Sequence, residues 1–257
     1  MNEPVAILLP HYNMPERADH LYEWVEANVR WPHHWVIVDD GSDMVMPSDH
    51  TTIRLRRRQE FIGATMVGLA YIKALEVSEG LRFGAYWMLT TSIRFPDPSA
   101  YGGQDILEGL MTAMRSDAQC VGVHPSLIPP VDGLAWTCML QRGGGQPRRV
   151  WGIDNTASLV DASWWDAGDW LDPRLQIGWG LMLDACYQGR RDGRTFYVHD
   201  GFPIHKDQGN AEKMGRRGDR ERRCALGGQQ MHAVLTPKYG PDFCERLGRS
   251  FTTPEMF

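Results

Sequence analysis

Two short apolar runs near the start of the chain each end in a polar turn. Residues 5–9 lead into Pro10-His11-Tyr12-Asn13, and residues 35–38 lead into Asp39-Asp40-Gly41-Ser42-Asp43. Residues 16–29 between them carry apolar side chains at helical spacing, which predicts a strand-helix-strand unit. Parallel strands joined in this way hold ligands at their carboxyl ends, so we expect both polar turns at one ligand-binding edge. A carboxylate pair followed by Gly-Ser can accept hydrogen bonds from a base or ribose, and the turn lets phosphate oxygens approach.

This pattern resembles the family 2 glycosyltransferases of GT-A fold, whose nucleotide-binding half reads strand, Pro-x-Tyr-Asn, helix, strand, Asp-Asp-Gly-Ser. The resemblance implies an α/β fold, a GT-A-type nucleotide-binding sandwich with a mostly parallel central sheet in a single domain. It also implies that Pro10, Tyr12, Asn13, Asp39 and Asp40 bind a nucleotide-sugar donor. The alternative, in which residues 39–42 only form a helix-capping turn, is weakened by the presence of Pro-x-Tyr-Asn at the family spacing.

The chain departs from the family at the end of the strand predicted over residues 83–89. The family carries Asp-x-Asp or Asn-x-Asp there, which holds a divalent cation, Mn²⁺ or Mg²⁺, against the donor diphosphate. This chain has Thr90-Thr91-Ser92, and hydroxyls are poor ligands for hard cations. Two options stay open: other groups hold the metal, or cationic side chains neutralise the diphosphate. The candidates for the second option are Arg94, His205 and Lys206, of which His205 resembles a family residue that contacts metal or diphosphate.

Further donor-binding candidates follow from the same comparison. Thr90 and Ser92 occupy the place of the family's metal-binding turn, and Gly63 matches the glycine of its Asn-x-Gly element. Phe61 replaces the asparagine of that element.

A third landmark is Gly178-Trp179-Gly180, which resembles the Gly-Trp-Gly of the family and makes Trp179 and Gly180 acceptor-side candidates. The family's acidic pair, one member of which is the general base, is replaced by Leu181 and Met182. Asp184 is the best surviving catalytic candidate, although two residues along a helix rotate it by about 200°. Equally open is a structural role in which Asp184 caps the helix or pairs with Arg190 or Arg191. The spare carboxylates are Asp154, Asp169 and Asp172.

Composition limits the class of protein. The 257 residues suit one compact domain, and a net charge of −5 argues against general polyanion binding, despite basic clusters at residues 54–58 and 213–223. Five widely spaced cysteines without Cys-x-x-Cys predict neither a disulfide framework nor a zinc site, which favours the cytoplasm. No apolar run approaches the ~20 residues of a membrane span, so we expect no membrane span.

We expect residues 1–98 to form the nucleotide-sugar-binding half, residues 99–205 the acceptor-side half, and residues 206–257 a covering C-terminal tail. The remaining segments are expected to be a helix over 101–115, a hairpin-like segment around 134–140 and a closing or edge strand over 195–198. They continue with a polar loop over 207–223 and short helices over 229–247, interrupted by prolines.

The resemblance implies a glycosyltransferase that uses an inverting single displacement, an atypical metal site and a donor such as a UDP-linked sugar. Its acceptor would be a glycan or small molecule. Two alternatives stay open. One is a catalytically silent nucleotide-sugar or glycan-binding protein, which the missing carboxylates would explain. The other is a transferase acting on hydroxylated bases of DNA, in which the basic clusters contact the phosphate backbone.

Overall fold

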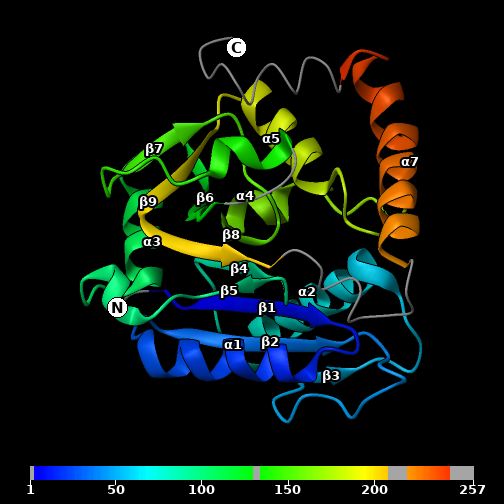
Figure 1. Cartoon of the computed structure of the whole chain (residues 1–257), viewed down its shortest axis with the longest axis horizontal. Helices are drawn as coiled ribbons and strands as arrows, with labels where there is room; N and C mark the ends of the chain where they lie inside the picture. The colour runs from blue at the N-terminus through cyan, green and yellow to red at the C-terminus, as the bar shows by residue number, and fades with distance from the viewer. Residues whose placement is uncertain (1–2, 130–133, 208–218, 244–257) are drawn as a thin grey trace.

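The computed structural model describes residues 3–129, 134–207 and 219–243, which form an α/β fold around a mixed sheet (Figure 1). In this part of the chain the strands are β1 (Val5–His11), β2 (His33–Asp39), β3 (Ile53–Arg54), β4 (Ala85–Leu89), β5 (Ile93–Arg94), β6 (Cys120–Leu127), β7 (Pro147–Val150), β8 (Ala157–Asp161) and β9 (Thr195–Lys206). The helices are α1 (Pro15–Asn28), α2 (Glu60–Glu79), α3 (Ile106–Arg115), α4 (Ala162–Ala167), α5 (Leu181–Arg191) and α7 (Asp219–Tyr239), with 3₁₀ turns η1 (Pro98–Tyr101) and η2 (Leu134–Met139).

The strand order brings the ends of distant segments to one edge of the sheet. That order is β3-β2-β1-β4-β8-β6-β9-β5, and β7 also pairs with β9. β1 is parallel to β2 and β4, β8 is antiparallel to β4 and β6, and β9 is parallel to β6. The carboxyl ends of β1, β2, β4 and β9 therefore share an edge with the amino end of β8.

The expected α/β fold with a largely parallel sheet is confirmed. The predicted halves, residues 1–98 and 99–205, are joined in one sheet by the pairing of β4 with β8. Their division into a donor side and an acceptor side stays a prediction.

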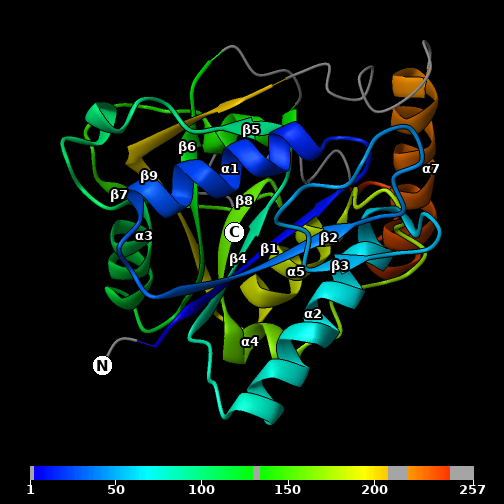
Figure 2. The same cartoon turned by 90° about the horizontal axis from the view of Figure 1, so that it is seen from below.

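Helices α1 and α2 cover opposite faces of the β1–β2 part of the sheet (Figure 2). α2 lies close to the sheet because Gly68 has no side chain: a Cβ there would lie 2.3 Å from Leu8 Cδ1 and 3.2 Å from Val38 Cγ2. The expectation that no apolar run approaches the length of a membrane span is wrong for α2, which is long and apolar enough. It is weak evidence for a span, since a core helix packed on β1 and β2 passes the same test.

The helix expected from residue 101 begins later, at Ile106, and the reason is a capping aspartate. Asp105 Oδ1 accepts hydrogen bonds from the backbone N–H groups of Leu107 (2.8 Å) and Glu108 (3.2 Å). Its other oxygen accepts from the N–H groups of Arg30 (2.5 Å) and Trp31 (3.0 Å). Asp105 therefore fixes the start of α3 and ties it to the loop before β2.

Other expectations for the second half of the chain are also wrong. Residues 134–139 form the 3₁₀ turn η2, where a hairpin-like segment was expected. The strand expected over 195–198 is present as part of β9, but the expectation that it could be an edge strand is wrong, because β9 runs to Lys206 and pairs with β6, β7 and β5. Residues 219–239 form one helix, α7, where the sequence predicted a polar loop and short helices. Pro237 lies in the last turn of this helix. The rest of the predicted covering tail lies outside the described residues.

Candidate functional site

The turns after β1 and β2 are hydrogen-bonded into one unit. Asn13 Oδ1 accepts from the backbone N–H of Asp43 (3.1 Å), and the Asn13 N–H donates to Ser42 Oγ (2.8 Å). Asp43 Oδ1 in turn accepts from the Tyr12 hydroxyl (2.8 Å) and from Asn13 Nδ2 (3.0 Å). Asn13 has a φ of 54°, a left-handed conformation that asparagine adopts more readily than most residues. The predicted Tyr12 and Asn13 are thus held rigidly against the second turn.

Two buried polar side chains at this edge carry atoms that lack a hydrogen-bond partner among the described residues. Asp39 is 0 % exposed; its Oδ1 accepts from the Ser42 N–H (2.9 Å), whereas Oδ2 forms an ion pair with Arg54 Nε (3.3 Å) but accepts no hydrogen bond from the described residues. His11, opposite Asp39 in the register, is 4 % exposed with both ring nitrogens unpaired. Burial lowers the pKa of His11, against the attraction of Asp39 and Asp19. Unpaired buried groups cost about 1–3 kcal/mol each, so a ligand that pairs with them is favoured here.

His11 was not among the residues predicted on this turn, which were Pro10, Tyr12 and Asn13. Pro10 and His11 are the last two residues of β1 and both are buried. The sequence signal that could have found His11 is its position, because an ionisable side chain that directly continues a buried strand reaches the ligand-binding edge.

Asp40 joins the second turn to the start of α2. Its Oδ1 accepts from the backbone N–H of Gln59 (2.6 Å), and burial raises the pKa of Asp40 to about 6. The Arg58 guanidinium just before α2 stacks over the Tyr12 ring, 4.0 Å from its centroid. Gly63 lies one turn into α2 against the Gln59 side chain. Asp40 thus holds the turn in place, and the donor contacts of Asp40 and Gly63 stay predictions.

The turn after β4 brings together three predicted residues. Thr90 Oγ1 and Ser92 Oγ lie 2.7 Å apart, and Lys206 Nζ donates to Ser92 Oγ (2.5 Å). Lys206 arrives there because β9 pairs with β5, which sets it opposite Ile93. The result is a pair of hydroxyls capped by an ammonium group at the ligand-binding edge.

The other two predicted cationic side chains, Arg94 and His205, form the next pair in the register of β5 and β9, beside Ile93 and Lys206. His205 is opposite Arg94 in the register of β9 and β5. Burial, and then the charge of Arg94, lower the pKa of His205. His205 is therefore mostly neutral at neutral pH, and Lys206 carries the positive charge next to the hydroxyls.

A buried histidine supports this edge from β6. His124 is 0 % exposed, and its Nδ1 lies 2.5 Å from the carbonyl oxygen of Pro125, which only an N–H can satisfy. Nε2 therefore accepts from the Thr156 hydroxyl (3.1 Å), and the Thr156 carbonyl accepts from the Thr90 N–H (3.0 Å). Burial lowers the pKa of His124 to about 4, so this neutral ring holds the Thr90 turn in place.

Asp154 lies just before β8 and is half-buried at the same edge. Burial raises its pKa to about 6, although Lys206 opposes the shift. Burial lowers the pKa of Lys206 to about 8, although the negative charge of Asp154 opposes this shift. Another spare carboxylate, Asp172, is held by Arg174 (2.6 Å) in a turn. Asp154 is thus the spare candidate that shares an edge and an electrostatic interaction with Lys206.

The Gly178-Trp179-Gly180 turn lies between the start of α2 and α7. Both glycines have φ near 90° (88° and 89°), which glycine adopts without strain. A Cβ on Gly178 would lie 2.5 Å from Phe61 Cδ1, and one on Gly180 2.9 Å from Met231 Cγ, so side chains would collide at both places. Trp179 packs on Gly227 of α7 and is 44 % exposed. An aromatic face is therefore open to solvent on the predicted acceptor side.

Asp184, the predicted catalytic base, is 1 % exposed. One of its oxygens accepts from Gln188 Nε2 (3.0 Å) and from the Tyr239 hydroxyl, and the other from Lys238 Nζ. These donors come from α5 itself and from the end of α7. A carboxylate that is buried and already bonded to three donors cannot reach an acceptor hydroxyl, so the geometry counts against Asp184 as the base.

The ion pair considered from the sequence, between Asp184 and Arg190 or Arg191, is not the one that the structure shows. Arg190 and Arg191 lie in the last turn of α5, whereas Asp184 lies in its first turn and faces α7. The ion pair of Asp184 is with Lys238, 54 residues away in the chain. Sequence spacing within α5 could not have revealed this partner.

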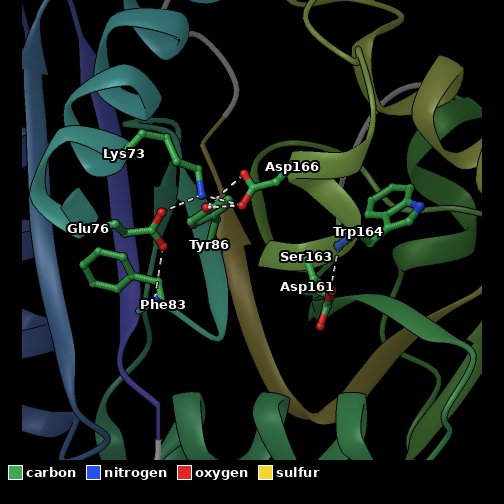
Figure 3. A network of polar contacts seen from close by, with 8 residues as sticks. All are labelled: Lys73, Glu76, Phe83, Tyr86, Asp161, Ser163, Trp164 and Asp166. Carbon is green, nitrogen blue, oxygen red and sulfur yellow. Dashed lines mark hydrogen bonds and ion pairs between the residues drawn. The ribbon is translucent and has the colours of Figure 1, made fainter. Parts of the chain in front are cut away.

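A second polar network lies toward the amino end of β4, away from the site (Figure 3). Lys73 of α2 contacts Glu76 (2.7 Å) and also Asp166 of α4, which accepts from the Tyr86 hydroxyl (3.0 Å). Glu76 in turn accepts from the Phe83 N–H (3.3 Å). This network ties α2 to α4 across β4 and is structural.

Solved structures share this fold. A structure of GalNAc-T7 with UDP, GalNAc and Mn²⁺ matches with a TM-score of 0.57 and 12 % identity, over 80 % of this chain and 44 % of that chain. The mannosyltransferase PcManGT from Pyrobaculum calidifontis, in complex with GDP-Man and Mn²⁺, matches with a TM-score of 0.56 and 13 % identity, over 91 % of this chain and 64 % of that chain. The fold is that of the GT-A glycosyltransferases. No protein-family model and no curated protein matches the chain, so membership of family 2 stays a prediction.

Both of these GT-A structures contain Mn²⁺, but the residues of this GT-A chain do not fit a divalent cation at the β4 turn. Thr90 and Ser92 supply neutral hydroxyls that are bonded to each other, and the ammonium of Lys206 lies against them. Hard divalent cations require oxygen ligands with negative charge, and an ammonium repels them. Within the described ranges, no group of three or more His, Cys, Asp or Glu side chains is placed to hold a metal ion.

Proposed function

We propose that this chain is a glycosyltransferase that moves a sugar from a nucleotide-sugar donor to an acceptor hydroxyl by an inverting single displacement. The observation that carries the proposal is the buried pair His11 and Asp39 at the carboxyl ends of β1 and β2. Both His11 ring nitrogens and Asp39 Oδ2 lack hydrogen-bond partners in the described structure. A nucleotide base offers both donors and acceptors and can pair with both side chains. The GT-A fold supports this location, because ligands of open α/β sheets bind at this edge.

The donor would extend from the base-binding pair toward the β4 turn. Tyr12 and Asn13 line the first part of this edge, and Thr90, Ser92 and Lys206 lie farther along it, at the end of β4. The carboxyl ends of β1 and β4 are neighbours, so one diphosphate can span from the first group to the second. UDP- and GDP-linked sugars are both candidate donors, since both bases present an N–H for Asp39 Oδ2.

The transfer needs a base for the acceptor proton. As the acceptor oxygen bonds to the anomeric carbon, the bond from that carbon to the diphosphate breaks and its electron pair leaves on the diphosphate, while the acceptor proton passes to a base. We propose Asp154 for this role in place of Asp184. Asp154 is half-buried beside the β4 turn, and its pKa of about 6 leaves it deprotonated yet basic at neutral pH.

Thermal unfolding with a panel of nucleotides tests the donor site. A ligand that binds the native state raises the melting temperature by mass action, so UDP, GDP or one of their sugar conjugates should stabilise the protein. Asp39→Asn should abolish this stabilisation, because the buried carboxylate oxygen is lost. Asp192→Asn, a change of the same kind at an exposed position at the end of α5, should keep it. No stabilisation of the unmodified protein by any nucleotide would refute the proposal.

A catalytically silent binding protein is the main alternative, favoured by the hydroxyls at the β4 turn and the absence of the family's acidic pair. It shares the donor site and differs in turnover. Donor hydrolysis separates the two: an active enzyme releases sugar slowly to water and loses this release in Asp154→Asn, whereas a silent protein binds the donor and releases nothing.

A transferase acting on hydroxylated bases of DNA is a narrower alternative. It is favoured by Arg56 and Arg57, which are exposed between β3 and α2 near the donor turns. The second basic cluster, residues 213–223, lies mostly outside the described residues. DNA binding through these groups should weaken steeply with salt.

We also propose a cytoplasmic location, since the cysteine pattern suits a reducing compartment.

A further inference from the structure

The side chain of Lys206, the last residue of β9, reaches the turn at which the family that this chain resembles carries metal-binding carboxylates. Lys206 Nζ lies 2.5 Å from Ser92 Oγ, and Ser92 Oγ lies 2.7 Å from Thr90 Oγ1. Two hydroxyls stand where the family has two carboxylates, and an ammonium group lies against one of them. These features are complementary: without the carboxylates a divalent cation loses its ligands, and without the cation a diphosphate needs another positive charge.

The backbone holds Lys206 firmly in this place. β9 pairs with β5 so that Lys206 is opposite Ile93, and the N–H of Asp207 donates to the Ser92 carbonyl (2.7 Å). The end of the β4 turn that leads into β5 is therefore tied to the segment that carries the lysine. An ammonium positioned in advance loses less conformational entropy when it binds an anion.

Two carboxylates are close to Lys206 in sequence or in space. Asp207, the next residue, is paired with Arg17 of α1 (2.6 Å), which balances its charge. The charge of Asp154 acts on Lys206, but burial outweighs it and lowers the pKa of Lys206 to about 8. The lysine is thus mostly protonated at neutral pH. Partial burial reduces solvent screening and strengthens its attraction for a phosphate.

We propose that the ammonium group of Lys206, held by Ser92 and Thr90, takes the place of the divalent cation and binds the diphosphate of the donor, so that donor binding needs no metal ion. This inference rests on the proposed function. A charge-assisted hydrogen bond from lysine to a phosphate oxygen is of the strong kind. The same charge stabilises the negative charge that develops on the diphosphate as the bond to the sugar breaks.

Isothermal titration calorimetry of UDP and GDP with the full chain, in EDTA and in MnCl₂, tests this inference. We expect at least one of the two nucleotides to bind equally well in both buffers. Lys206→Met, which keeps the length of the side chain and removes its charge, should weaken binding about 10- to 100-fold in EDTA. Lys206→Arg keeps the charge and should recover most of that affinity.

The outcomes separate this inference from the proposed function. If neither nucleotide binds in either buffer, the proposed function is refuted. If a nucleotide binds only with Mn²⁺, or if Lys206→Met binds as well as the unmodified protein in EDTA, the donor site stands and the role of Lys206 is refuted. A variant that combines Thr90→Asp, Ser92→Asp and Lys206→Ala should acquire Mn²⁺-dependent binding, because it restores the ligands that a hard cation requires. Equal binding by this variant in EDTA and MnCl₂ would contradict the exchange of charges that we infer.

Discussion

Asp184→Ala tests whether the buried carboxylate of α5 is structural or catalytic. In the native structure it accepts hydrogen bonds from Gln188, Lys238 and Tyr239 and is 1 % exposed. Lys238 is 35 % exposed and can turn to solvent, so its ion pair contributes about 0–1 kcal/mol. The Tyr239 hydroxyl loses a hydrogen bond to a charged group, which is worth about 1.5–3 kcal/mol, and the Gln188 bond adds about 0.5–1 kcal/mol. We therefore expect the free energy of unfolding to fall by about 2–5 kcal/mol.

Thermal unfolding monitored by circular dichroism measures this change. A loss of about 2–5 kcal/mol lowers the melting temperature of a domain of this size by about 4–20 °C. Asp192→Ala, an exposed change at the end of the same helix, is the matched control and should shift it little. Tyr239→Phe should cause part of the loss. An Asp184→Ala protein with an unchanged melting temperature and no sugar transfer would refute this reasoning and restore Asp184 as the base.

Three further predictions use other parts of the molecule. Gly68→Ala should lower the free energy of unfolding by about 1–3 kcal/mol, because its Cβ would lie 2.3 Å from Leu8 Cδ1. Gly228→Ala, which has open space around it in α7, should raise the free energy of unfolding by about 1 kcal/mol. Thermal unfolding of the two variants compares these effects. Burial raises the pKa of Asp40 and of Asp154 from 3.8 to about 6, so the native state keeps protons that the unfolded state has released, and stability should fall as the pH rises from about 4 to 6. The denaturant midpoint should depend less on pH across this range when both residues are changed to asparagine. An equal pH dependence in the two proteins would contradict the assignment of this effect to Asp40 and Asp154. Sugar transfer should rise as the pH passes through about 6, and Asp154→Asn should lose transfer while it keeps nucleotide binding.

The first half of the site could be predicted because its residues are close in sequence. β1, α1 and β2 follow one another, each with a clear apolar pattern, and parallel pairing necessarily brings the turns at residues 10–13 and 39–43 together. The strand predicted over residues 83–89 also corresponds to β4. Local rules were sufficient here because each element is set by its own pattern and each turn by its own polar residues.

The second half could not be predicted at the same level. The sequence of α7 reads in part as a polar loop, yet these residues form a helix. Contacts with distant segments stabilise that helix: it packs on the Gly178–Gly180 turn, and Lys238 near its end binds Asp184. Asp105 caps α3 and also binds the loop before β2, 75 residues away. Such contacts join segments that are far apart in the chain, and no short-range pattern in the sequence encodes them.

The sequence by itself determined the α/β fold, the polar turns that end β1 and β2, and the replacement of carboxylates by hydroxyls after β4. Only the tertiary structure decided which groups stand beside those turns. It buried Asp184 under α7, left atoms of His11 and Asp39 without hydrogen-bond partners in the described structure, and placed Lys206 against Ser92. The physical reason is that strand periodicity and turn chemistry act over a few residues, whereas burial, pKa and ion pairing depend on neighbours that sheet pairing brings from more than 100 residues away, as with Ser92 and Lys206, 114 residues apart.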